Sequence, residues 1–241
     1  MQAMTRIFGR SRAGGEGQEA HWLSVSDLMA GLMMVFLFIA IALMRTAILE
    51  RNMIKEIAVA YRDNQVAIYE ALSQEFEKDL ERWDADIDRQ TLAFEFHAPD
   101  VLFGRGETEV RPDFRAILSD FFPRYLEVLD GFRDSIDEIR IEGHTSSDWG
   151  GAASETDAYF LNMRLSQGRT RSVLEYVYDL PAIVAERDWV KQHFAAVGFS
   201  SSRVVLDESG AEDPEHSRRV SFRVVTNAET QIRRIIDEDP R

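Results

Sequence analysis

One acidic residue, Asp27, lies at the start of a long uncharged stretch. Residues 28–44 read LMAGLMMVFLFIAIALM and contain no Asp, Glu, Lys or Arg. With His21, Trp22 and Leu23 ahead of Asp27, the apolar segment reaches about 22 residues, enough at ~1.5 Å per residue to cross a ~30 Å hydrocarbon core. An ionisable group inside such a helix costs up to about 2.5–3.5 kcal/mol at the bilayer centre. The pattern predicts a transmembrane helix over residues 22–44, with Asp27 as a functional group.

A second interpretation of Asp27 is a helix N-cap or first-turn acid outside the membrane, stabilised by the helix dipole. The span would then begin at Leu28, and residues 28–44 alone are at the short limit of the range of about 17–25 residues. Trp22 lies on the outer side of Asp27, where an interfacial aromatic residue is typical. Both observations favour Asp27 inside the membrane helix.

Asn162 and Arg169 form a second pair of candidates, in a predicted helix over residues 159–178. Their spacing is close to two helical turns, so both side chains lie on one face. Arginine can bind a carboxylate through two hydrogen bonds, and asparagine offers both a donor and an acceptor. The pair predicts a site for a ligand with an anionic group and an amine. For Arg169 alone, a surface salt bridge is the alternative.

The histidines do not suggest catalysis. His144 follows a predicted strand, and no second His, acid or Ser stands at ligand or triad spacing to it. Gly104-Arg105-Gly106 lacks the following glycine and helix of a phosphate-binding loop. We predict a structural role for His144, no metal site, no cofactor and no enzymatic activity. The other histidines are scattered along the chain: His21, His97, His193 and His216.

Composition limits the class of protein. The 241 residues are 45% hydrophobic and 29% charged, which is typical of one globular domain of moderate size beside one membrane span. The absence of cysteine excludes disulfides, zinc–thiolate sites and cysteine nucleophiles. A net charge of −14 argues against non-specific binding to nucleic acid, which needs clustered Lys and Arg.

Three segments flank or follow the predicted span. Residues 1–21 carry three arginines and a glycine-rich stretch, and are predicted to be a short tail. A signal peptide is the alternative, but the apolar run is too long and lacks a convincing cleavage site. Residues 45–89 contain no Pro or Gly and are predicted to be an amphipathic helical stalk. Residues 226–241 are predicted to be a C-terminal tail with a short helix at 232–239.

The stalk has a narrow apolar seam, which suits a two-stranded coiled coil in which Asn64 fixes the register. A helix packed on its own domain is the alternative. The seam residues are Ile54, Ile57, Tyr61, Ile68, Leu72, Phe76, Leu80, Trp83 and Ile87.

Residues 90–225 are predicted to fold as an α+β sandwich, with helices packed on one face of a small sheet. Hydrophobic periodicity and breaker residues indicate the order of its elements. The expected elements are a strand at 91–96, a turn at 101–106, a helix opened by Pro112, a strand at 139–145, helices at 159–178 and 183–197, and a last strand at 218–225.

The membrane segment resembles a known family. Residues 21–37 read HWLSVSDLMAGLMMVFL, which is similar to the transmembrane helix of MotB-type stator subunits, where Trp, Ser and Asp-Leu-Met precede an apolar run. In that family the Asp carries the motor ion, so the resemblance implies this role for Asp27. The resemblance also implies a cytoplasmic N-terminus in a bacterial inner membrane. Lys and Arg are balanced on the two sides of the span, so the positive-inside rule does not set the orientation, which rests on the resemblance.

The C-terminal part resembles a second family through three motifs in order. Gly143-His144-Thr145, the residues 162–169 (NMRLSQGR) and Arg218-Arg219-Val220 are similar to signatures of OmpA-like peptidoglycan-binding domains. The resemblance covers residues 90–225 and implies a periplasmic domain that binds the diaminopimelate of the peptide stem. The motifs assign the ligand site to Thr145, Ser146, Asn162, Leu165 and Arg169.

Together the two resemblances imply an ion-driven motor subunit, most similar to the B components of Zorya anti-phage defence systems. The implied partners are a second copy through the membrane helix and stalk, a pentameric MotA-like membrane subunit, and peptidoglycan. The transported ion is a proton or sodium. A passive membrane-to-wall tether and a flagellar stator subunit are the alternatives.

The sequence departs from the family at one position of the expected site. The signature has Asp after Gly-His-Thr, and this chain has Ser146 followed by Ser147. The hydroxyl cannot give an ammonium group the charge-assisted hydrogen bond, which is about twice as strong as a neutral one. Asp148, Glu155 or Asp157 are candidates to replace the missing acid.

Overall fold

A computed structural model of the chain describes residues 16–97 and 99–227, and the side chains of residues 25–97 and 101–227 among them. The contacts divide the chain into two units, with the boundary between Glu56 and Ile57. The tail predicted at 1–21 is described only from residue 16, and the helix predicted at 232–239 lies outside the described residues.

Helix α1 (Glu16–Phe76) contains the predicted membrane segment and most of the predicted stalk. Its apolar part is long and apolar enough to cross a membrane, with a mean hydropathy of 2.5, and none of that part is buried. From Val25 to Met44 the side chains are exposed, which is what a helix surrounded by lipid requires.

The last turns of α1 belong to the core of the C-terminal domain. Ile68, Leu72 and Phe76 are fully buried, and their spacing of four residues places them on one face of the helix. For these residues the structure therefore shows the alternative to a coiled coil, a helix packed on its own domain. Tyr61 and Ile54, earlier on the seam, are 41% and 56% exposed.

The structure also differs from the predicted start of the domain at residue 90. After α1 the chain forms a short helix α2 (Leu80–Trp83) and strand β1 (Ala85–Asp88), where a continuous helix was predicted. No Pro or Gly stops the helix; instead Asp84 takes a left-handed conformation (φ 48°), Trp83 is buried and β1 pairs with the next strand. Tertiary contacts override helix propensity here.

A five-stranded sheet forms the centre of the domain, in the order β1-β2-β7-β3-β4. β3 and β4 are parallel, and the other neighbours are antiparallel. The last of the described strands, β7, pairs with β2 on one side and β3 on the other. The strands after β1 are β2 (Ala93–Phe96), β3 (Ile136–His144), β4 (Phe194–Ser200) and β7 (Val220–Thr226).

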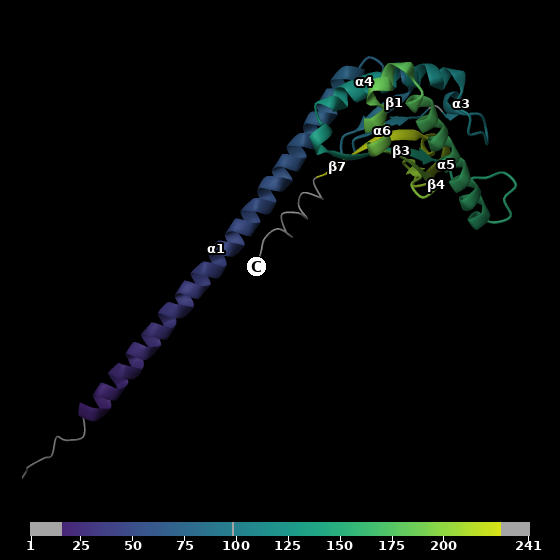
Figure 1. The fold of residues 1–241 in the computed structure, drawn as a ribbon. Coiled ribbons are helices and arrows are strands. Elements are labelled where there is room, and N and C mark those ends of the chain that lie inside the picture. Colours follow the sequence, from purple (N-terminus) through teal and green to yellow (C-terminus); the bar gives the residue numbers. More distant parts are fainter. Residues whose placement is uncertain (1–15, 98, 228–241) are drawn as a thin grey trace, which may run out of the picture. The chain divides into compact units, whose positions relative to one another are not determined.

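One face of this sheet is covered by α4 (Pro112–Asp130) and α5 (Glu155–Tyr178), as Figure 1 shows. Phe94, Phe222 and Ile141 are neighbours across three strands and are fully buried. They meet a group of aromatic rings from the helices; Phe121 lies 4.7 Å from Phe94 and 5.1 Å from Phe222 between ring centroids. The predicted α+β architecture is confirmed, with helices on one face of a small sheet.

The helix predicted at residues 183–197 is wrong over its last four residues, 194–197. The chain forms the 3-10 helix η2 (Pro181–Glu186) and the short helix α6 (Arg187–His193), and then turns into strand β4. The apolar run at 194–199 has no periodicity that separates a strand from a helix, and pairing with β3 decides it. The smaller elements are α3 (Pro99–Leu102), η1 (Arg133–Ser135), β5 (Val205–Leu206), β6 (Glu212–Asp213) and α7 (Pro214–Ser217).

Candidate functional site

All five residues predicted to hold a ligand line one cavity of about 620 Å³. Thr145 and Ser146 follow the end of β3, whereas Asn162, Leu165 and Arg169 lie on α5. The fold brings the two groups together from separate elements. The remaining lining residues are Phe103, Arg105, Gly106, Asp148, Trp149, Gly150 and Arg218.

Two glycines allow α5 to lie close to the ends of β3 and β4. A Cβ atom on Gly143 would come 2.9 Å from the backbone oxygen of Ser166, and one on Gly198 would come 2.5 Å from the backbone nitrogen of Gln167. Larger residues cannot be accommodated at such distances. The Ser166 hydroxyl accepts a hydrogen bond from the backbone N–H of Ser200 at 3.1 Å. This packing holds the strand ends beside the first half of α5.

Asn162 shapes the loop that follows β3. Its side chain is buried, and its amide nitrogen donates to the backbone oxygens of Ser146 at 3.1 Å and Asp148 at 3.4 Å. The amide donor is therefore used within the protein, and the amide oxygen remains available to a ligand. From the sequence we expected Asn162 to offer the ligand both its amide donor and its amide acceptor; in the structure only the amide oxygen, the acceptor, can do so.

Arg169 is held by backbone carbonyls. Its Nε donates to the oxygen of Glu107 at 2.9 Å and its Nη2 to the oxygen of Gly104 at 3.1 Å. The guanidinium carbon lies 4.8 Å from the centre of the Phe103 ring, a distance typical of a cation–π contact. Burial, and then the charge of Arg218, lower the pKa of Arg169 to about 10. Arg169 forms no ion pair with a described residue, so the surface salt bridge is not observed.

Cations outnumber acids around the cavity. Arg105, Arg169 and Arg218 line it, and Asp148 is the one acid among the lining residues. The Nε of Arg218 is buried and has no hydrogen-bond partner within residues 16–97 and 99–227. Guanidinium groups with unused donors bind carboxylates strongly. The cavity is therefore suited to a ligand with an anionic group and, near Asp148, a cationic one.

Among the three acids predicted to replace the missing family Asp, Asp148 alone lines the cavity. The backbone N–H of Asp157 donates to the Ser154 hydroxyl at 3.1 Å, and that hydroxyl donates to the Asp157 carboxylate at 2.8 Å. Asp157 is thus engaged at the N-terminus of α5, where Ser154 is the N-cap. Glu155 is exposed in the first turn of the same helix.

His144 lies at the end of β3 and is 4% exposed. Its ring stacks on Phe199, with centroids 5.3 Å apart, and its Nε2 is 3.6 Å from the Glu142 carboxylate. Burial lowers the pKa of His144, against the raising effect of Glu142. His144 is not among the residues that line the ligand cavity.

Asp27 lies within α1, about three turns after the helix begins at Glu16. It is therefore not an N-cap, because the backbone is helical on both sides. Its side chain is exposed, as are its apolar neighbours from Leu28 onward.

Sequence reasoning missed the part of the cavity wall that comes from residues 103–106 and from Trp149. Gly106 has a positive φ of 72°, which glycine adopts without strain, so its turn was a detectable signal. Arg218 belongs to the Arg218-Arg219-Val220 motif, but no role in the ligand site was predicted for it from the sequence. Its position before β7 brings it to the cavity through sheet pairing that the chain order does not reveal.

A curated relative is similar over almost the whole chain. Zorya protein ZorB from Escherichia coli is 58% identical over 235 residues, which cover 98% of this chain and 100% of the relative. No family model matches the chain.

Three solved structures are similar over the C-terminal domain. They are a putative MotB-like protein from Desulfovibrio vulgaris (20% identity, 70% of this chain and 93% of that chain, TM-score 0.46), the cell wall anchor of the T6SS from Pseudomonas aeruginosa (20%, 64% and 96%, 0.44) and the periplasmic domain of Helicobacter pylori MotB (14%, 65% and 92%, 0.43).

Proposed function

The chain belongs to the family of the Zorya protein ZorB, and from this membership we propose that it is the wall-anchored, ion-carrying subunit of a membrane motor that acts in anti-phage defence. Asp27 carries the ion, a proton or sodium, and the C-terminal domain binds peptidoglycan. Two copies pair through the membrane helix and the exposed part of the stalk, inside a pentamer of a MotA-like partner. The N-terminus is cytoplasmic and the domain periplasmic.

The observation that carries the wall-binding part is the cavity beside α5. The five residues assigned from the motifs line it, and neither Arg169 nor Arg218 is paired with an acid among the described residues. Both side chains are half-buried, and a partly desolvated arginine without an anionic partner is stabilised when a ligand supplies the opposite charge. The peptide stem of peptidoglycan offers both carboxylates and an amine, which matches the donors and the single acid of this cavity.

In the proposed complex, a stem carboxylate binds between Arg169 and Arg218. The amine of diaminopimelate lies toward Asp148, which takes the place of the acid that the family has at Ser146. The Ser146 hydroxyl gives a neutral hydrogen bond only. Because the acid is displaced by two positions along the loop, binding is expected to be weaker than in domains with the complete signature.

The motor part rests on Asp27 and its surroundings. An acid in the membrane segment 22–44, which is otherwise uncharged, is costly to retain. A carboxylate that binds and releases an ion in turn can couple ion flow to rotation of a partner ring. A passive tether uses the same wall site but has no need for an ionisable group at Asp27, so substitution of this residue separates the two functions.

Retention on purified sacculi tests the wall site. The full chain in detergent is incubated with sacculi, and the bound fraction is compared for wild type, Arg169→Ala, Arg169→Lys and Arg171→Ala. Arg171 is the matched control, because it lies on the same helix, is 77% exposed and pairs with Glu175. Thermal unfolding of each variant shows that the fold is intact.

We expect Arg169→Ala to lower retention at least tenfold, Arg169→Lys to lower it severalfold through loss of the planar fork, and Arg171→Ala to have no effect. Asp148→Asn should weaken retention, and Ser146→Asp should strengthen it. Equal retention of wild type and a folded Arg169→Ala variant would show that the cavity does not bind the wall.

A further inference from the structure

The face of the sheet opposite the helices carries a row of polar residues. Asp86 is directly opposite Glu95, Glu95 is opposite Ser221, and Ser221 is opposite Glu142. Two carboxylates directly across an antiparallel pair, such as Asp86 and Glu95, repel each other. This arrangement therefore needs positive charge close to it.

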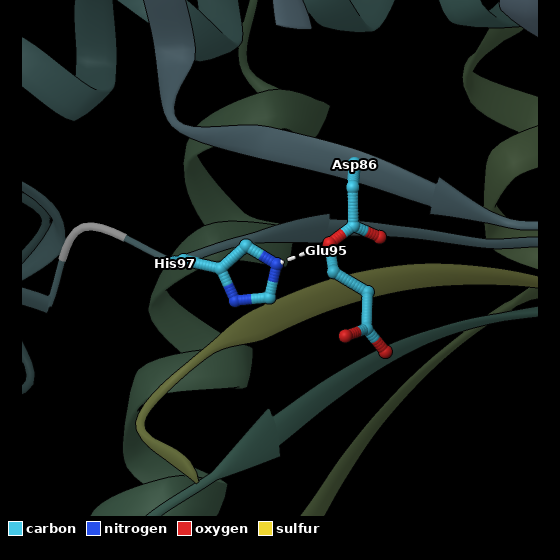
Figure 2. Close-up of side chains that lie close together, drawn as sticks. All are labelled: Asp86, Glu95 and His97. Atoms are coloured by element: carbon cyan, nitrogen blue, oxygen red, sulfur yellow. Dashed lines mark hydrogen bonds and ion pairs between the residues drawn. The ribbon is translucent and has the colours of Figure 1, made fainter. Parts of the chain in front are cut away.

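Residue His97 joins the two acids at one end of this row. Asp86, Glu95 and His97 each place one ligand atom so that the three atoms lie within 4.8 Å of one another. Figure 2 shows the His97 ring turned toward Asp86, with Nε2 2.6 Å from the Asp86 carboxylate. The backbone N–H of His97 donates to the oxygen of Asp84 at 2.9 Å, which fixes the residue just past β2.

The hydrogen bonds of His97 are incomplete. Its Nδ1 is buried and has no partner among the described residues. Nε2, the other ring nitrogen, faces the acids (Figure 2) and is the atom that an ion between them would bind. A second histidine, His216 of α7, has its ring centroid 5.8 Å from that of His97. The sequence had suggested scattered histidines; the fold brings these two together.

His216 is oriented as metal-binding histidines usually are. Its Nδ1 lies 2.7 Å from the Asp213 carboxylate, and its Nε2 has no partner within the described part of the chain. A carboxylate on one ring nitrogen fixes the tautomer and directs the other nitrogen to a ligand. Asp213 is itself held by the backbone N–H groups of Glu215 and His216, at 3.0 and 3.1 Å.

We propose that Asp86, Glu95 and His97 bind one divalent transition-metal ion of the zinc type, with His216 as the fourth ligand. Two nitrogens and two carboxylate oxygens are a common tetrahedral set for zinc. Two imidazoles on one zinc at about 2.0–2.1 Å have ring centroids about 5 Å apart, close to the distance between His97 and His216. The ion would neutralise the opposed carboxylates and join the β1–β2 edge to α7.

The simpler explanation is a set of ion pairs without metal. His97 pairs with Asp86, and Glu95 pairs with Nε of Arg219 at 3.0 Å. Among the described residues, these pairs leave His216 Nε2 without a partner, and they do not explain why Asp213 fixes the second ring beside the first. On metal binding, Nε2 of His97 and the Asp86 carboxylate, which lie 2.6 Å apart, must separate to about 3.3 Å, the spacing of ligand atoms in a tetrahedral zinc site. The ligand atoms that lie farther apart, up to 4.8 Å, must draw together.

Zinc titration of the full chain, purified without a metal-affinity tag and treated with a chelator, tests the site. The readouts are bound zinc per chain, the shift in Tm with ZnCl₂, and the visible absorption of the cobalt-substituted protein, which reports tetrahedral coordination. The variants are His97→Gln and His216→Gln. His193→Gln is the matched control, because His193 stacks on Trp189 away from the cluster.

We expect one zinc per chain in the wild type and in His193→Gln, with a raised Tm and tetrahedral cobalt bands. His97→Gln should lose binding at least 100-fold, and His216→Gln at least tenfold. Wild-type affinity in either His97→Gln or His216→Gln, or less than one zinc per chain in the wild type at saturation, would overturn the proposal. Wall retention is a separate measurement, so loss of this site leaves the proposed function standing.

Discussion

At the scale of single residues, Asp27 is where charge and the proposed motor are most directly connected. Asp27→Asn removes the charge at nearly constant shape, so membrane insertion and assembly should be retained or improved. We expect phage protection to fall to the level of cells without the system. Plaque counts, together with the amount of protein in the membrane fraction, measure this.

Glu50→Gln is the matched control for Asp27→Asn, because Glu50 is an exposed acid on the same helix beyond the apolar part. It should leave protection unchanged. Full protection by a membrane-inserted Asp27→Asn variant would favour the passive tether and contradict the motor.

A second residue-scale prediction concerns His144 and pH. Burial keeps the pKa of His144 below 6.5 in the folded state, against the raising effect of Glu142 and with the charges of Arg219 and Arg203 lowering it further. Below pH 6.5 the unfolded chain binds a proton at this position that the folded chain does not, so stability falls as pH falls. The slope approaches about 1.4 kcal/mol per pH unit until the folded pKa is reached.

The measurement is the difference in Tm between wild type and His144→Gln from pH 7.5 to pH 5. Because His97 has a raised pKa and contributes in the opposite sense in both proteins, only the difference isolates His144. We expect the Tm advantage of the wild type to shrink by a few degrees toward pH 5. A constant difference would mean that His144 titrates alike in the folded and unfolded chain.

At the scale of elements, helix α1 serves two environments. Leu72 is fully buried in the domain core and Leu49 is 58% exposed on the same helix. Leu72→Ala should destabilise the domain by about 2–5 kcal/mol, whereas Leu49→Ala should leave its unfolding unchanged. Urea unfolding followed by tryptophan fluorescence, to which Trp83 in the same core contributes, measures both. Equal midpoints would contradict the assignment of residues 68–76 to the core.

Elements with strong periodicity were predictable from the sequence, and those set by pairing were not. Pro112 and the spacing of Phe114, Leu118 and Phe121 indicated α4, and all three side chains are fully buried. By contrast, Ile87 in β1 continues the helical spacing of the apolar residues before it. The apolar run of β4 has no periodicity that separates a strand from a helix. Both are edge strands of the sheet, and their pairing with one neighbour decides their structure.

The same difference holds for the ligand cavity. The motifs predicted the residues at the end of β3 and on α5, because their spacing is local. They could not indicate that the loop at residues 103–106 packs against Arg169. Close packing of this part of the chain on α5 requires Gly168, because a Cβ atom there would come 2.6 Å from Cγ2 of Thr108. The buried positions Ala158, Asn162, Ser166 and Thr170 of α5 are small or polar, so hydrophobicity gave no signal for them.

At the scale of the whole molecule, pairing of two copies is expected through the exposed part of the α1 seam. Ile54 and Tyr61 are exposed, and a double change to Asp would place like charges between two helices. We expect this variant to be a monomer in light scattering of the detergent-solubilised protein, with an unchanged domain Tm. Arg62→Asp, at a position that is 75% exposed, is the control and should remain a dimer. A dimeric double variant would exclude this seam.

The position of β7 has a consequence for biosynthesis. The strand at residues 220–226 is the last of the described strands but lies between β2 and β3, so the two halves of the sheet cannot join before the ribosome has made these residues. At about 5–20 residues per second, the earlier strands wait for many seconds with unpaired edges. Nascent chains of this protein should therefore depend on chaperones until release, and a stop codon before residue 220 should yield a product that is degraded rather than a shortened domain.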